Sequence, residues 1–190
     1  MMENVLIVSC TGKSATLFTE MLNEVSVNQI TVLKSAGEAR RLSMKQNFDL
    51  VIINSPLADE SGESLSRHIA SNSFSQVILA VKSESYNAAA AVCEEDGVLT
   101  ISKPVNKEIF WLALSLAKSA RNRIKRIQAE NMQLKQKIED IRIIDRAKLL
   151  LISYLNLSEQ EAHRFIEKQA MDLRSSKRAI AEGVLKTYAS

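Results

Sequence analysis

The sequence is poor in cysteine, proline and glycine, and these shortages exclude several classes of structure. Of its 190 residues, 2 are cysteine, 2 are proline and 5 are glycine. Cys10 and Cys93 lie far apart in apolar surroundings without a Cys-x-x-Cys pair, so neither a disulfide framework nor a zinc site is indicated. No run of apolar residues approaches the length that spans a membrane. We therefore expect a soluble, cytoplasmic protein that does not contact a membrane.

The sequence also lacks the motifs that carry catalysis. It contains no Gly-rich phosphate loop, no nucleophile elbow and no cluster of metal ligands. Its two histidines, His68 and His163, stand in unrelated contexts. An enzyme is therefore the least expected class, and we predict no catalytic residue, no metal and no cofactor.

The charge of the chain is distributed unevenly. The net charge is +3, but residues 1–120 carry 10 Lys/Arg against 13 Asp/Glu, whereas residues 121–190 carry 15 against 9. This asymmetry places any polyanionic partner at the C-terminal part. A basic tail can also be merely a solvated surface, so charge alone leaves both readings open.

Short apolar runs alternate with helical patterns over the first 105 residues. Parallel strands covered on both faces read as continuous β-branched runs, and strands that alternate with helices indicate a doubly wound α/β fold. We predict a flavodoxin-like domain at residues 1–106 with five parallel strands. The expected strands are 5–8, 29–33 (the weakest), 50–53, 77–81 and 98–101, and the expected helices are 15–25, 36–46, 61–71 and 85–95.

A long helix is predicted next, because no Pro or Gly occurs between Pro104 and Gly183. Apolar residues repeat there every seven positions over four to five heptads, which is typical of a coiled coil. The alternative is an amphipathic helix packed on its own domain, but about 40 residues would extend about 60 Å. We assign residues 107–138 to a coiled-coil linker. Its predicted dimer seam contains Ile124, Ile127, Asn131, Leu134 and Ile138.

Asn131 bears on how many helices associate. A lone Asn at an a position costs stability but favours a two-stranded parallel pairing in a fixed register. Glu130 and Lys135 occupy g and e′ positions, where they can pair across a dimer, whereas Lys137 and Arg142 would repel each other. The pattern favours a parallel homodimer.

The five-strand pattern, with Lys103-Pro104 after the last strand, resembles the receiver domains of two-component response regulators. A working receiver needs acidic residues after its first strand to hold Mg²⁺, and an aspartate after its third strand to accept the phosphoryl group. Here Ser9 and Cys10 occupy the first positions and Asn54 occupies the acceptor position.

The remaining positions of this pocket are also altered. Val81 replaces the hydroxyl residue expected near the fourth strand, and only Lys103 is retained. We therefore predict a pseudo-receiver that is not phosphorylated at this pocket. Lys103 either bonds backbone carbonyls at the turn or marks a pocket that senses a small ligand or a regulatory protein.

Three helical patterns fill residues 139–190 and predict a small three-helix bundle. Ser158 and Glu161 form a capping box that starts the second helix, and Ser175 or Ser176 starts the third. We expect the bundle to be built from apolar stripes of the three helices. The expected inward residues are Ile144, Ala147, Leu151 and Leu155, then Ala162, Phe165, Ile166 and Ala170, then Ile180, Val184 and Leu185.

The order and spacing of IIDRAKLLL, LSEQEAHRFI and QAMDLR resemble the ANTAR domain of bacterial transcription antitermination regulators. The resemblance implies binding to RNA hairpins in nascent transcripts, where an antiterminator hairpin is stabilised. Lys and Arg side chains supply phosphate contacts, and aromatic rings stack on unpaired bases. His163 and Tyr188 are candidates for stacking. The predicted RNA-binding residues are Arg142, Arg146, Lys148, Arg174 and Lys177.

Two other functions remain open at this point. A coiled-coil scaffold would use the seam to bind a protein partner. A DNA-binding regulator is less consistent with the chain, because none of the three helices shows the Gly-containing turn of a helix-turn-helix.

Overall fold

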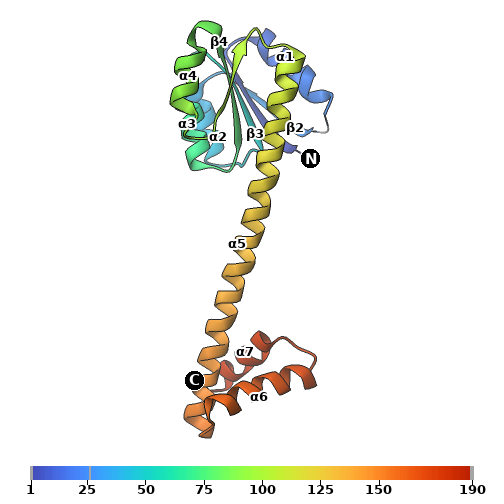
Figure 1. The fold of residues 1–190 in the computed structure, drawn as a ribbon, viewed down its shortest axis with the longest axis vertical. Helices are drawn as coiled ribbons and strands as arrows, with labels where there is room; N and C mark the ends of the chain where they lie inside the picture. Colours follow the sequence, from blue (N-terminus) through green and yellow to red (C-terminus); the bar gives the residue numbers. More distant parts are fainter. Residues whose placement is uncertain (1, 26, 189–190) are drawn as a thin grey trace. The chain divides into compact units, whose positions relative to one another are not determined.

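The computed structural model describes residues 2–25 and 27–188. The chain divides into two compact units, residues 1–126 and residues 127–190, which we call the N-terminal and C-terminal units and describe separately. Figure 1 shows their elements along the chain. The domain boundaries predicted after residues 106 and 138 stay predictions.

The N-terminal unit is built on a five-stranded parallel sheet, as the sequence predicts. The strand order is β2-β1-β3-β4-β5, the flavodoxin-like doubly wound order. All five predicted strands, including the weakest, are present. Their bounds are β1 (Met2–Ser9), β2 (Val27–Leu33), β3 (Leu50–Asn54), β4 (Gln76–Lys82) and β5 (Leu99–Lys103).

Helices cover both faces of this sheet, which explains why its strands are apolar at successive positions (Figure 1). One face packs on α1 (Gly12–Asn23) and on the first part of α5 (Lys107–Leu155), where Phe18 and Phe110 are buried. The other face packs on α2 (Ala36–Ser43), α3 (Glu63–Asn72) and α4 (Tyr86–Cys93), with the 3₁₀ turn η1 (Ser83–Ser85) before α4. Arg121 of α5 also binds Asp49 beside the start of β3.

The first two heptads of α5 belong to the core of the N-terminal unit. Phe110, Ala113 and Ala117 fit the heptad pattern but are buried against the sheet. This part of the helix therefore packs on its own domain, which is the alternative that the sequence disfavoured. Beyond residue 126 the apolar residues of the heptad pattern face solvent in the single chain. Leu134 and Ile138 are 57% and 53% exposed.

The C-terminal unit is a three-helix bundle made by the end of α5, α6 (Glu159–Asp172) and α7 (Lys177–Tyr188). The capping box of Ser158 and Glu161 is present, and Ser176 accepts the Ala179 N–H at the start of α7. Six buried residues form the core: Ala147, Leu151, Ala162, Ile166, Ala181 and Val184.

Two of the predicted core residues of this bundle are wrong. Phe165 is exposed because Ala162, Ile166 and Ala170 define the buried stripe of α6, and Phe165 lies about 100° around the helix from Ile166. Leu155 is exposed because it is the last residue of α5. Within the described residues, no helix combines the length and apolarity needed to cross a lipid bilayer.

Candidate nucleic-acid interface

The pocket at the carboxyl ends of β1 and β3 contains an amide and a hydroxyl. Asn54 Nδ2 donates a hydrogen bond of 3.0 Å to Ser9 Oγ, which in turn donates to the Thr11 carbonyl at 3.1 Å. Both side chains are buried, and Ser9 and Asn54 are direct neighbours in the β1–β3 register. Over residues 2–25 and 27–188 no group of three or more His, Cys, Asp or Glu residues is arranged to hold a metal ion.

Lys103 lies at the same edge of the sheet and donates a hydrogen bond to the backbone carbonyl of Ser55. Burial lowers the pKa of this lysine. The contact corresponds to one of the two roles that the sequence left open, bonding of backbone carbonyls. Cys10 is exposed, with its Sγ 3.1 Å from the Pro56 carbonyl oxygen, whereas Val81 is buried in the core.

The excess of positive charge lies mostly outside the bundle itself. Residues 139–190 carry 9 Lys/Arg and 8 Asp/Glu, so only a small part of the C-terminal excess belongs to them. Four cations instead cluster in one stretch of α5, residues 121–126. The capacity of the bundle to bind a polyanion therefore depends on which of its charges are already paired.

Several of the bundle's cations are held by carboxylates. Lys148 binds Asp145 at 2.8 Å and Glu159 at 3.3 Å, and its side chain is only 15% exposed. The hydrogen bond that Lys148 donates to Asp145 raises the pKa of this lysine. Lys177 binds Glu167. These two predicted RNA-binding residues are thus already engaged within the chain.

Arg178 bridges two helices in the same way. It binds Asp140 of α5 at 2.7 Å and Glu182 of α7 at 2.8 Å. The hydrogen bond from Arg178 lowers the pKa of Asp140. Arg178 therefore links α5 to α7 by ion pairs and stabilises the bundle. Nothing in the sequence distinguishes this structural role from the RNA-binding role expected of the neighbouring cations.

The pairing leaves more unpaired cations than unpaired carboxylates on the surface of the bundle. Six of the eight carboxylates of the bundle lie within 4.0 Å of a cation, Glu161 is in the capping box, and Asp172 alone has neither arrangement among residues 139–188. Within the same described stretch, five exposed cations have no such ion pair: Arg146, Arg164, Lys168, Arg174 and Lys186. The unpaired charge of the bundle is therefore predominantly positive.

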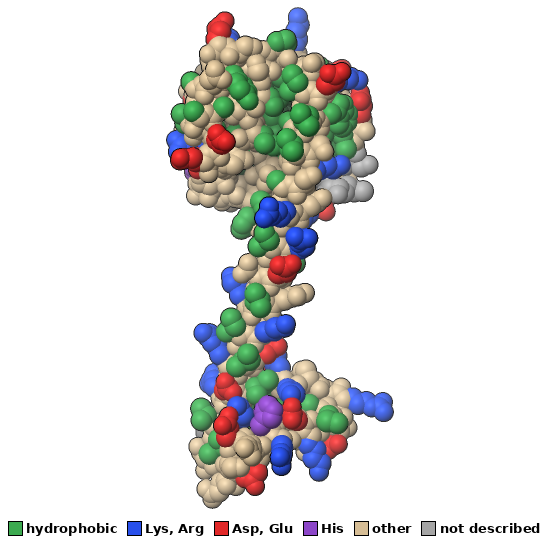
Figure 2. All heavy atoms as spheres, viewed as in Figure 1, with side chains coloured by type: hydrophobic (Ala, Val, Ile, Leu, Met, Phe, Trp, Pro, Cys, Tyr) green, Lys and Arg blue, Asp and Glu red, His purple; other side chains and the backbone are tan. Residues whose placement is uncertain are grey.

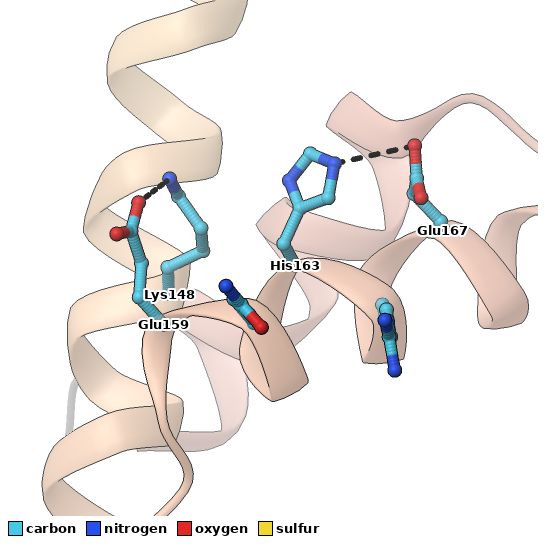
Figure 3. A pocket seen from close by; sticks show the side chains of 6 residues that line it. Lys148, Glu159, His163 and Glu167 are labelled. Atoms are coloured by element: carbon cyan, nitrogen blue, oxygen red, sulfur yellow. Dashed lines mark hydrogen bonds and ion pairs between the residues drawn. The ribbon is translucent and has the colours of Figure 1, made fainter.

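The predicted RNA-binding residues do not share one face. Arg146 and Lys148 are two positions apart on α5, which places them about 200° apart around the helix. Arg142 lies one turn before Arg146 on the same side. Lys148 points instead toward the start of α6, where it meets Glu159 (Figure 3).

A shallow hollow of about 470 Å³ lies between Lys148 and α6. We call it the His163 hollow. His163 Nε2 lies 3.3 Å from a Glu167 oxygen, and the imidazole stands between that carboxylate and the Lys148–Glu159 pair (Figure 3). Sequence reasoning missed most of this site, although its α6 members lie at helical spacing opposite the buried stripe. The hollow is lined by Lys148, Glu159, Gln160, His163, Arg164 and Glu167.

The turn between α6 and α7 presents Arg174 from an unusual backbone conformation. Its φ of 47° lies in the left-handed region that favours glycine. The Ser175 N–H bonds the Ala170 carbonyl at 2.9 Å and the Arg174 N–H bonds the Met171 carbonyl at 3.2 Å, which together form a Schellman ending. Tyr188, the other predicted stacking residue, already contacts the ring of Tyr154 with centroids 5.4 Å apart.

Residues 132–185 match the ANTAR domain family, and they span the end of α5, all of α6 and most of α7. Over 168 residues the chain is 25% identical to the transcriptional regulatory protein PdtaR of Mycobacterium tuberculosis, covering 88% of this chain and 82% of that protein. The chain therefore carries an ANTAR domain. It is accordingly a transcription regulator of the antitermination type.

The N-terminal unit of the ANTAR regulator has the receiver fold. The receiver domain of an HD domain-containing protein from Pseudomonas fluorescens Pf-5 aligns with a TM-score of 0.58 at 20% identity, covering 66% of this chain and 93% of that one. A receiver domain protein from Clostridium thermocellum aligns with a TM-score of 0.57 at 19% identity, covering 66% and 98%. Ser9, Cys10 and Asn54 therefore stand on a receiver fold in which neither metal-binding nor acceptor carboxylates are present at these positions.

Proposed function

We propose that this ANTAR regulator binds RNA hairpins in nascent transcripts through its C-terminal unit. A bound antiterminator hairpin excludes the overlapping terminator, so that the polymerase continues. The observation that carries the proposal is the coincidence of the ANTAR match with a bundle whose unpaired surface charge is cationic. Lys and Arg side chains gain affinity by neutralising phosphates and releasing counterions.

The cations fall into two groups with different expected roles. Arg146 on α5 and Arg174 in the turn are exposed and unpaired, and Arg142, on the same side of α5 as Arg146, is exposed with only a 3.9 Å contact to Glu139. Lys148 and Lys177 are paired with carboxylates, so either lysine would reach a phosphate only by giving up its partner. We therefore expect the exposed arginines to contribute more affinity than the paired lysines.

We further propose that the regulator acts as a parallel homodimer. Ile127, Leu134 and Ile138 repeat at heptad spacing on α5 and remain exposed in the single chain. Figure 2 shows hydrophobic side chains along this helix between charged ones. A second α5 would bury them, with Ile124 and Asn131 completing the seam. Two copies then present two RNA-binding modules to two hairpins.

The receiver-fold domain is proposed to act without phosphorylation. An amide at position 54 cannot take up a phosphoryl group as a carboxylate does, and Ser9 and Cys10 are poor ligands for Mg²⁺. The RNA-binding activity is then regulated by a small ligand or a regulatory protein that binds the pseudo-receiver.

Binding of purified full-length protein to a two-hairpin leader RNA tests the proposal. We expect a complex whose affinity falls steeply as salt rises, and a loss of affinity in an Arg146→Ala/Arg174→Ala variant. Lys13→Ala/Lys45→Ala, which removes two exposed cations of the N-terminal unit, serves as the matched control and should leave the affinity nearly unchanged. No complex at low salt would refute RNA binding. Activity that survives loss of the arginines but not of Ile138 would instead indicate the scaffold function.

A further inference from the structure

We infer that the His163 hollow holds one unpaired nucleobase of the bound RNA, preferentially a base that carries an amino group. This inference rests on the proposed RNA binding and adds a site for reading bases. Sequence is read in RNA mainly where bases are unstacked, by stacking on flat side chains and by hydrogen bonds to the base edge. The hollow contains groups for both interactions.

The imidazole of His163 provides the flat surface. Its side chain is 50% exposed, so one ring face can receive a base. Glu167 holds the ring at 3.3 Å and is itself bound by Lys177 of α7, which fixes the carboxylate from a second helix. The ring is therefore oriented before RNA arrives, and less side-chain freedom is lost on binding.

The charge of the hollow favours a base over a phosphate. Its lining contains two cations, Lys148 and Arg164, and two carboxylates, Glu159 and Glu167. A phosphate would gain little from such a balanced set and would be repelled by the carboxylates. A neutral base with polar edges meets no such penalty.

The same lining groups can discriminate among bases. A carboxylate has about four sites that accept hydrogen bonds, so Glu159 retains capacity beside Lys148. Gln160 offers an amide donor and acceptor, and its side chain has no hydrogen bond within the described chain. Amino groups of adenine, cytosine or guanine can donate to these acceptors. Uracil has no amino group and is expected to bind less well.

Binding measurements with abasic RNAs test the site in the full-length protein. Removing the base that occupies the hollow should weaken binding of the natural protein about tenfold, since each base stacked on a ring contributes appreciably. His163→Ala should cause a similar loss, and the two losses should not add. His163→Phe should restore most of the affinity because it keeps a ring. If no abasic position is coupled to His163, the base site is refuted although RNA binding stands.

Histidine NMR separates this inference from the proposed function. The chain has only two histidines, so His68 of α3 in the N-terminal unit is an internal reference. Single-stranded oligoadenylate or oligocytidylate should shift the His163 ring signals more than oligouridylate does, and should leave those of His68 in place. A selective shift without hairpin binding would retain the base site and refute hairpin recognition. Unmoved or equally moved signals of the two histidines would overturn the base site.

Discussion

The side-chain amide of Asn54 donates a 3.0 Å hydrogen bond to the hydroxyl of Ser9 inside the receiver-fold domain. Two neutral groups thus satisfy one another where a phosphorylated receiver carries carboxylates. Because both side chains are buried, the pair is part of the packed interior.

Asn54→Asp should not create a phosphorylation site. Treatment with Mg²⁺ and acetyl phosphate should leave the intact mass of both the natural protein and this variant unchanged, because Ser9 and Cys10 remain without carboxylates. The new carboxyl is buried, and Lys103 at the same edge of the sheet is held by the Ser55 carbonyl, so the pKa of the carboxyl should rise, and at pH 7 the variant should lose about 1–3 kcal/mol of unfolding free energy. That deficit should shrink as the pH falls and the carboxyl becomes neutral. A mass gain of one phosphoryl group would contradict the prediction.

Asp49→Asn should destabilise the N-terminal unit at neutral pH. Partial burial opposes ionisation of Asp49, but the Glu3 N–H and the Arg121 guanidinium outweigh it and hold its pKa below the usual value. A lowered folded-state pKa gives stability that is present above the unfolded value of 3.8 and is lost as the pH falls through the folded value. Urea unfolding should show a loss of about 2 kcal/mol at pH 7, and almost none at strongly acidic pH.

The matched control for this experiment is Glu84→Gln, which neutralises an exposed carboxylate of η1. It should leave the unfolding free energy nearly unchanged at both pH values. Equal effects of the two substitutions would show that Asp49 does not stabilise α5 on the sheet.

Arg174→Gly should increase stability while weakening RNA binding. Glycine adopts the left-handed conformation of this position without the steric cost paid by arginine, which is about 1 kcal/mol. Urea unfolding of the C-terminal unit and fluorescence anisotropy with hairpin RNA measure the two effects. Arg174→Ala removes the same charge but retains the steric cost, so it should weaken RNA binding without the gain in stability. An unchanged RNA affinity in both variants would exclude Arg174 from the interface.

Ile138→Lys should dissociate the dimer. A charge at an a position is costly to bury, and two copies would place two lysines opposite one another. Sedimentation equilibrium should give a dimer mass for the natural protein and a monomer mass for the variant. Gln133→Lys adds the same charge at a c position of the same helix and should remain dimeric. A monomeric natural protein would refute the seam.

Much of the architecture could be predicted because it follows from local sequence. The buried strands are continuous β-branched runs, and the start of α6 is fixed by Ser158 and Glu161 within one helical turn. Helical periodicity did not predict the exposure of Phe165 correctly. A residue at the edge of an apolar stripe is buried only if a neighbouring helix covers it. The His163 hollow was not predictable for a related reason, because Lys148 and Lys177 reach its α6 residues from two other helices.

The sequence by itself determined the order of strands and helices, the family of the C-terminal domain and the absence of carboxylates at Ser9, Cys10 and Asn54. These features depend on residue identity and on spacing within single elements. Only the tertiary structure decided that Phe110 and Ala117 face their own sheet while Ile138 remains exposed, and that Lys148 is paired while Arg146 is not. Burial and ion pairing depend on which distant residues meet, and a heptad pattern or a count of charges does not contain that information.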